Sequence, residues 1–369
     1  MSSSSLHLAL YRLKVPLREP YKLSFGPVLW FDTIVVEATG ANGERGYGEA
    51  TVLTGYTDET IEDAWSTAKA FATRATGAGI REALNTLVTT HPFTATAFGT
   101  ALDMLDGHVM LAVDRPIAVP ILGLLHAREE PAMEREIDEL LARGYRTLKL
   151  KVGFELETDI SFVRTAQRLC RGRLKLRVDA NQAYTAQEAQ RFVTAVTPEH
   201  IELFEQPCAA GDWDSHMTVA KVSQLPLMLD ESIYGLADIE RAAELRAAAY
   251  IKVKLMKLGN IDALAASIAR IRELGMKPVL GNGVACDIGC WMEACVAARL
   301  IDNAGEMNGY LKASGSLLRE PPPFRDGAIQ LTPGYRPVLD PEALERYAID
   351  RWSGAVSRST STTAMKEPT

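Results

Sequence analysis

Five charged residues recur at nearly regular intervals in the middle of the sequence, and their types suit proton-transfer chemistry. Each stands at or near the end of a short apolar segment. They are separated by 28, 26, 25 and 24 positions and are Lys151, Asp179, Glu205, Asp230 and Lys254. Carboxylates that converge on one place repel one another unless a cation is present. A lysine held beside a dication and out of bulk water has a depressed pKa, so it can act as a base near neutral pH.

The segments that carry these residues read as short buried strands separated by helices. The strands are LKLKV, LKLRVDAN, IELFEQP, LPLMLDE, YIKVKLM and KPVLGNG, and helical patterns occupy residues 130–143, 157–170, 186–196, 236–248 and 261–274. A strand, a loop and a crossover helix need roughly thirty residues or slightly fewer. Repeated units of this kind build a parallel sheet, and about eight of them close into a barrel. We therefore predict an α/β barrel over residues 116–320.

The lysines of the barrel are predicted to point inward. Lys149 and Lys151 share one strand face, because side chains two positions apart point the same way, and the leucines and valine of that segment suit the outer helix layer. The segment IKVKL repeats the arrangement with Lys252 and Lys254. The strands of Lys151 and Lys254 lie four apart in a ring of eight, hence on opposite sides. One lysine can take a proton from one face of a carbon while the other delivers to the opposite face, as in a racemase.

The three carboxylates between the lysines predict a metal site. Three carboxylates that leave room for water and substrate oxygens meet the needs of Mg²⁺, with Mn²⁺ as the alternative ion. A metal that binds a substrate carboxylate stabilises the enediolate formed as the α-proton leaves. Any one of these carboxylates alone would be interpreted as a helix cap or as part of a salt bridge. A single K-x-K motif alone would be interpreted as part of an exposed edge strand. Their joint spacing favours the functional interpretation, and the predicted partner is a small-molecule carboxylate.

Composition excludes other classes of function. The chain has 369 residues, a net charge of −7 and no dense Lys/Arg run, which argues against nucleic-acid binding. Its N-terminus has no signal-peptide pattern, and no stretch of about twenty apolar residues occurs, so no membrane partner is expected. The five cysteines are scattered without a C-x-x-C pair and are interpreted as reduced thiols of a cytoplasmic protein.

The two ends of the chain predict a second domain. Residues 1–115 begin with strand patterns and continue with helical patterns, which is typical of an α+β unit. Residues 321–357 are turn-rich and could return to the N-terminal sheet. Residues 358–369 are polar and are expected to be disordered.

Taken jointly, the motifs resemble those of the enolase superfamily, and specifically its muconate-lactonizing-enzyme subgroup of muconate cycloisomerases, dipeptide epimerases and N-acylamino acid racemases. They are K-L-K at 149–151, D-A-N at 179–181, E-Q-P at 205–207, D-E-S at 230–232 and I-K-V-K-L-M-K-L-G at 251–259. The resemblance implies a modified TIM barrel, (β/α)7β, with an α+β capping domain formed by both chain ends. It implies Mg²⁺ on Asp179, Glu205 and Asp230, catalysis by Lys151 and Lys254, and electrostatic assistance by Lys149.

The resemblance also suggests where substrate binds. Loops 24–30 and 51–57 would close over the site, and the predicted substrate contacts are Asn181, Phe25, Trp30, Tyr56, Asp287, Glu306 and Asn308. For Asp287 a helix N-cap is the competing interpretation. The segment VLGNGVACDIG lacks histidine, which excludes the mandelate-racemase branch. Dipeptide epimerases carry D-x-D where this chain has Glu306-Met307-Asn308, and GEMNGYL is closer to the cycloisomerases.

The sequence therefore predicts an isomerase that abstracts the proton α to a carboxylate. The leading hypothesis is a racemase or epimerase of an amino-acid derivative, namely an N-acylamino acid, a dipeptide or an imino acid. The alternative is a cycloisomerase or dehydratase of the muconate or o-succinylbenzoate type, and a non-catalytic binding barrel is a third possibility. Uptake of deuterium without a change of constitution separates the first from the others. We also expect a homo-oligomer, because barrels of this size often associate.

Overall fold

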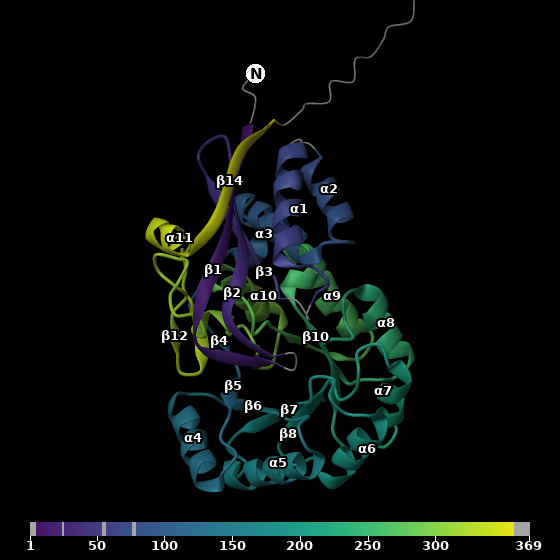
Figure 1. Cartoon of the computed structure of the whole chain (residues 1–369). Coiled ribbons are helices and arrows are strands. Elements are labelled where there is room, and N and C mark those ends of the chain that lie inside the picture. Colours follow the sequence, from purple (N-terminus) through teal and green to yellow (C-terminus); the bar gives the residue numbers. More distant parts are fainter. Residues whose placement is uncertain (1–4, 24–25, 54–56, 76–78, 358–369) are drawn as a thin grey trace, which may run out of the picture.

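The structure is a computed structural model, and it describes residues 5–23, 26–53, 57–75 and 79–357. An antiparallel four-stranded sheet in the order β14-β1-β2-β3 forms its first layer. The strands are β1 (Ser5–Leu23), β2 (Gly26–Thr39), β3 (Arg45–Thr51) and β14 (Ala348–Ser357). The C-terminal β14 lies alongside the N-terminal β1 (Figure 1), so the last part of the described chain returns to the first.

Three helices cover this cap sheet because apolar side chains alternate with other residues along its strands and need a partner to pack against. In LHLALYRLKV the side chains of Leu6, Leu8 and Leu10 are fully or almost fully buried, and they pack in one cluster with residues of the helices. The helices are α1 (Ile61–Arg74), α2 (Ile80–Leu87) and α3 (Pro92–Leu105), followed by the short η1 (Val109–Leu111). Within the described ranges no helix combines the length and the apolar character needed to cross a bilayer.

Glycines of β3 allow α3 to lie directly on the sheet. A Cβ atom at Gly46 would stand 2.1 Å from the carbonyl oxygen of Ala101, and one at Gly48 would stand 2.1 Å from that of Ala97. Any side chain at either position would push the helix away, since real Cβ atoms do not come so close. The motif G-Y-G therefore sets how closely the helix layer approaches the cap sheet.

The second layer is the predicted barrel of parallel strands, and this prediction is confirmed. Its hydrogen-bonded order is β11-β10-β9-β8-β7-β6-β5. The strands are β5 (Gly123–Leu125), β6 (Thr147–Lys151), β7 (Lys175–Asp179), β8 (Ile201–Glu205), β9 (Leu227–Leu229), β10 (Tyr250–Val253) and β11 (Lys277–Leu280). Figure 1 shows α4 to α8 in an arc outside these strands. The helices are α4 (Glu130–Ala142), α5 (Leu156–Cys170), α6 (Ala186–Ala195), α7 (Trp213–Ala220), α8 (Leu236–Glu244), α9 (Ile261–Glu273) and α10 (Asp287–Leu300).

A short segment around Gly305 closes the gap between the first and last strands of this sheet. The backbone N–H of Glu306 donates to Leu280 O at 3.0 Å, which ties the segment to β11. On the other side, Leu122 N donates to Gly305 O at 3.0 Å, next to β5. The segment therefore takes the place of an eighth strand and carries Glu306 to the barrel.

The remaining elements join the two layers. A three-stranded sheet has the order β12-β13-β4, and the connecting helices are short. These elements are β4 (Ile117–Pro120), β12 (Phe324–Arg325), β13 (Ala328–Leu331), η2 (Leu255–Lys257), η3 (Gly309–Leu311) and α11 (Pro341–Tyr347). The domain boundaries drawn from the sequence stay predictions, and residues 358–369 lie outside the described residues.

A buried carboxylate from the cap sheet binds the start of a barrel helix. Glu49 on β3 accepts hydrogen bonds from Cys286 N at 2.6 Å and Ile288 N at 3.2 Å, at the first turn of α10. The N-cap residue of α10 is Cys286, and Asp287 is its first helical residue. The N-cap interpretation of Asp287 was therefore wrong, because the capping carboxylate comes from a strand far away in the sequence.

We predict that this contact makes stability depend on pH. Burial, reinforced by the nearby Asp287, raises the pKa of Glu49 to about 8, although backbone N–H groups oppose this. A carboxyl group whose pKa is higher in the folded chain contributes stability below its unfolded value of 4.5 and loses it as pH rises through 8. The free energy of unfolding of wild type minus that of Glu49→Gln should therefore fall between pH 5 and 9, as measured by urea titration. Glu139→Gln, on the exposed face of α4, is the control, and a flat difference for Glu49→Gln would contradict the interpretation.

Candidate active site

The charged residues singled out in the sequence meet at the carboxyl ends of consecutive barrel strands. Lys149 and Lys151 lie on β6, while Asp179 ends β7 and Glu205 ends β8. Asp230 directly follows β9, Lys252 lies on β10 and Lys254 directly follows it. All are buried except Lys151, whose side chain is 26% exposed. Parallel strands bring their carboxyl ends to one edge, which explains the convergence.

Two lysines form the inner part of this cluster. Lys149 Nζ lies 2.8 Å from Asp179 Oδ2, 2.7 Å from Glu205 Oε2 and 2.6 Å from Glu306 Oε1. Lys252 Nζ lies 2.9 Å from Glu205 Oε1, and it also pairs with Glu306 Oε2. Each oxygen of the Glu306 carboxylate thus faces one of the two lysines. This carboxylate ties the strands β6 and β10 to the closing segment.

The other two lysines lie on opposite sides of the cluster. Lys151 Nζ lies 2.6 Å from Asp179 Oδ2 and also bonds Asn181 Oδ1. Lys254 Nζ lies 2.7 Å from Asp230 Oδ1. Three strands, β7, β8 and β9, separate the two lysine-bearing strands in the sheet. A molecule bound between them would therefore meet one amine on each side.

The carboxylates raise the pKa of Lys149, Lys151 and Lys252, which is the reverse of the sequence-based expectation. Burial lowers the pKa of Lys151, but the charge of Asp179 outweighs it, so the net shift is upward. The same balance holds Lys149 and Lys252 well above their ordinary pKa. The expectation of a depressed lysine pKa assumed a dication at the site. In the chain itself the lysine charges take the role of that cation.

The carboxyl groups of the cluster differ in the direction of their pKa shifts. Burial and the neighbouring Asp179 raise the pKa of Glu205 to about 7. Burial also acts on Asp230, but the charges of Lys252 and Lys254 hold its pKa well below the ordinary value. Glu205 therefore has the weakest compensation of the predicted metal ligands.

The cluster contains oxygen atoms that could hold a cation. Across the described ranges, no three acidic, histidine or cysteine side chains form a ready-made metal site. Lysine ammonium groups lie between the carboxylates instead. Glu205 Oε2 and Asp230 Oδ1 are buried, and each lies 2.7 Å from a lysine Nζ, that of Lys149 and that of Lys254 respectively. Carboxylate oxygens that already face a cation are hard anionic ligands of the kind that Mg²⁺ requires, so the donor set fits the predicted ion.

The predicted substrate contacts fall into three groups. Asn181 and Glu306 line the small cavity at the cluster. Trp30 donates to Asp32 Oδ2 at 2.8 Å, while the carboxylate of Asp287 accepts from Leu317 N at 2.8 Å, and neither lines that cavity. Asn308, which accepts from Lys312 Nζ at 2.9 Å, does not line the cavity either. Phe25 and Tyr56 lie outside the described residues. The roles of all predicted site residues stay predictions.

Sequence reasoning missed two side chains at this site and gave a third, Lys252, no role in it. Lys252 was noted only as a repeat of the K-x-K pattern, and that repeat was the signal for a second buried lysine. Tyr21 of β1 lines the cavity, and Lys312 lies 4.3 Å from the centre of its ring. The segment of β1 that carries Tyr21 reaches the barrel through a hydrogen bond from Arg18 N to Lys312 O at 2.9 Å. No spacing in the sequence predicts this contact, because it joins the two ends of the chain.

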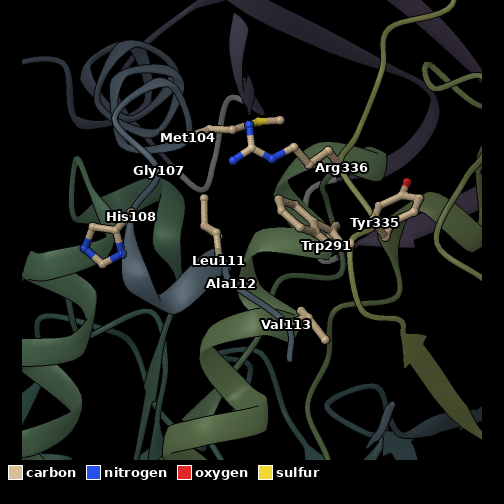
Figure 2. A pocket seen from close by; sticks show the side chains of 10 residues that line it. Met104, Gly107, His108, Leu111, Ala112, Val113, Trp291, Tyr335 and Arg336 are labelled. Carbon is tan, nitrogen blue, oxygen red and sulfur yellow. The ribbon is translucent and has the colours of Figure 1, made fainter. Parts of the chain in front are cut away.

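The cavity at the cluster is small, about 10 Å³, which is room for roughly one water molecule. A larger cavity of about 240 Å³ lies elsewhere, between η1, α10 and the segment before α11. Figure 2 shows Met104, Leu111, Trp291 and Arg336 around it. Among the described residues that line it there is no carboxylate and no lysine, and His108 is the one side chain that could act as a base or bind a metal ion. The chemistry therefore points to the smaller cavity.

Comparison with known proteins identifies the family. A family model described as Enolase C-terminal domain-like matches residues 132–342, more than half of the chain. The protein belongs to this family. The match spans every strand-end residue of the cluster from Lys149 to Glu306.

The relatives catalyse isomerisations. An N-succinyl-L-Arg/Lys racemase of Bacillus cereus is 26% identical over 315 residues, covering 81% of this chain and 82% of the relative. A muconate cycloisomerase of Acinetobacter lwoffii is 28% identical, covering 92% of this chain and 94% of the relative. These relatives identify the protein as an isomerase of the enolase superfamily.

Solved structures have the same fold. The crystal structure of the N-succinyl Arg/Lys racemase of Bacillus cereus superposes with a TM-score of 0.85 at 22% identity, covering 95% of this chain and 100% of that one. A dipeptide epimerase of Cytophaga hutchinsonii, complexed with Mg and the dipeptide D-Ala-L-Val, gives a TM-score of 0.83 at 20% identity, covering 95% and 99%. The predicted modified TIM barrel with a capping domain is confirmed.

We predict that Glu306 stabilises the folded protein through its two lysine partners. Glu306→Gln keeps the size of the side chain but removes the negative charge between Lys149 and Lys252. Removing one partner of a buried ion pair costs about 3 kcal/mol, so the free energy of unfolding should fall by roughly that amount. Urea titration of the metal-free protein measures it. Glu345→Gln, which breaks an exposed pair with Arg351, is the matched control, and equal small changes in both variants would contradict the prediction.

Proposed function

We propose that the protein is a Mg²⁺-dependent racemase or epimerase that removes the proton α to the carboxylate of an amino-acid derivative. One observation carries this proposal: Lys151 and Lys254 line the same small cavity, and three further strands separate the strands that bear them. A base on one side of a carbon and an acid on the other allow the configuration to invert. A relative that racemises N-succinyl amino acids and relatives that epimerise dipeptides support the same reaction.

We assign the proton transfers to Lys151 and Lys254. Each lies beside one carboxylate of the cluster, Lys151 by Asp179 and Lys254 by Asp230. Lys149 and Lys252 stay behind them, buried and paired with Glu306, so they supply fixed positive charge. A fixed charge close to the substrate carboxylate stabilises the charge that develops as the α-proton leaves.

We assign the Mg²⁺ ligands to Asp179, Glu205 and Asp230. All three carboxylates are buried and each lies within 2.8 Å of a lysine ammonium group, so they already gather around positive charge, which supports this assignment. When bound, Mg²⁺ would offset the negative charge of these acids and draw electron density from the substrate carboxylate. Without the pull of Asp179, burial alone would lower the pKa of Lys151, as a base requires.

The proposal also covers the cellular compartment, the oligomeric state and the closing loops of the enzyme. All five cysteines are free and buried, which suits a reducing compartment such as the cytoplasm. We propose a homo-oligomer as the working state, and light scattering of the purified chain would measure it. Loops 24–30 and 51–57 are proposed to close over the substrate.

Deuterium exchange tests the lysine assignments. In heavy water, the wild-type enzyme should label the α-carbon of both enantiomers of its substrate without changing its constitution. Lys151→Ala and Lys254→Ala should each lower the rate of exchange by roughly 10²–10⁴-fold for the enantiomer whose proton faces the missing lysine. Lys175→Ala, an exposed lysine of β7, is the control. A constitutional change such as ring formation or loss of water would instead favour the cycloisomerase or dehydratase alternative.

Metal binding is tested without relying on activity. Calorimetric titration should show that Asp230→Asn raises the Kd for Mg²⁺ by at least about tenfold, because a neutral amide replaces a charged ligand. Asp214→Asn, an exposed acid on α7, should bind as wild type. Unchanged affinity in Asp230→Asn would remove this residue from the ligand set.

A further inference from the structure

The wall of the active-site cavity formed by Tyr21 and Gly283 has a lysine directly behind it. A Cβ atom at Gly283 would lie 3.0 Å from Lys312 Nζ and 3.2 Å from Tyr21 Oη. Both Tyr21 and Gly283 line the cavity. Lys312 therefore presents its ammonium group next to the cavity, on the side that belongs to the cap strand β1.

Two neighbours hold this ammonium group in place. Lys312 Nζ donates to Gly283 O at 2.6 Å and to Asn308 Oδ1 at 2.9 Å. Both acceptors are neutral, so neither cancels the charge of the lysine. An ammonium group has three donors, and these two bonds leave one for another acceptor. No ion pair of Lys312 occurs among the described residues.

The hydrogen-bond acceptors of this wall are already occupied. Both oxygens of Glu306 pair with Lys149 and Lys252, and the amide oxygen of Asn308 accepts from Lys312. A substrate ammonium group placed here would find no free carboxylate and would lie close to a like charge. An oxygen acceptor placed here would instead meet Lys312 and the hydroxyl of Tyr21.

We propose that Lys312, with Tyr21, binds an oxygen acceptor of the substrate away from its reacting carboxylate. Building on the proposed function, this makes the substrate an amino acid whose nitrogen is acylated, and it selects an acyl group that ends in a second carboxylate. A dipeptide with a free ammonium group is a poor substrate by the same argument, because its terminal charge has the wrong sign.

The charges around Tyr21 agree with this role. Burial raises the pKa of the phenol, but the charges of Lys312, Lys151 and Lys149 outweigh it and bring the pKa below its ordinary value. The same positive field that acts on the phenol acts on any anionic group in the cavity. Tyr21 lines the same cavity as Lys149 and Lys151, and Lys312 Nζ lies 4.3 Å from the centre of its ring, so a substrate at Tyr21 would be close to both groups of lysines.

Three matched substrates test the proposal. We would measure kcat/KM for α-proton exchange with the N-succinyl and N-acetyl derivatives of one amino acid and with its alanyl dipeptide, in wild type and in Lys312→Met. Wild type should favour the N-succinyl derivative over the dipeptide by at least about tenfold, as expected for a charged hydrogen bond. In Lys312→Met the preference for N-succinyl over N-acetyl should disappear. This ratio is measured within one variant, so partial misfolding does not alter it.

Two further variants complete the experiment. Lys312→Arg keeps the positive charge and should keep part of the preference, whereas Lys221→Met, which removes an exposed lysine on the outer surface, should behave as wild type. A wild-type enzyme that prefers the dipeptide, or a Lys312→Met variant that keeps the succinyl preference, would overturn the proposal while leaving the proposed function intact. Absence of exchange with every substrate in the wild type would instead contradict the proposed function itself.

Discussion

Burial of charge at one end of the barrel is the constraint on which the rest of the structure depends. Four lysines and four carboxylates meet there, the carboxylates being Asp179, Glu205, Asp230 and Glu306, and the groups pair at hydrogen-bond distance. A single buried charge would cost several kcal/mol, so each group needs the others. The formal charges of these eight groups cancel. Adding a dication would therefore give the site a net positive charge, which favours binding of an anion. The same positive charge would lower the pKa of a neighbouring lysine, so that it releases its proton more readily.

The fold serves this array by bringing together parts of the chain that are distant in sequence. Five of the seven parallel strands, β6 to β10, supply most of the charges, and the segment around Gly305 adds Glu306 between the first and last strands. The cap sheet adds Tyr21 at the cavity and uses Glu49 to hold the start of α10. Because both contacts cross from cap to barrel, the position of the cap is coupled to the geometry of the site.

The sequence predicted the barrel and the clustering of its charges because both follow from periodicity. Strand alternation fixes which way Lys149 and Lys151 point, and the regular intervals place Asp179, Glu205 and Asp230 at one edge. Contacts between distant segments have no such periodicity. The pairing of Lys252 with Glu306 depends on how the barrel closes, and Lys312 meets Tyr21 only because β1 reaches the barrel. The lysine pKa shifts also could not be foreseen, since they depend on which carboxylate lies within hydrogen-bond distance.

The most direct test of the account is a crystal structure grown with Mg²⁺ and an unreactive substrate carboxylate. We expect one ion bound by an oxygen from each of Asp179, Glu205 and Asp230, with the amines of Lys151 and Lys254 on opposite sides of the α-carbon. The account would be contradicted if all three carboxylates stayed paired with lysines and no ion was bound. An α-carbon that both amines approach from the same side would contradict it equally.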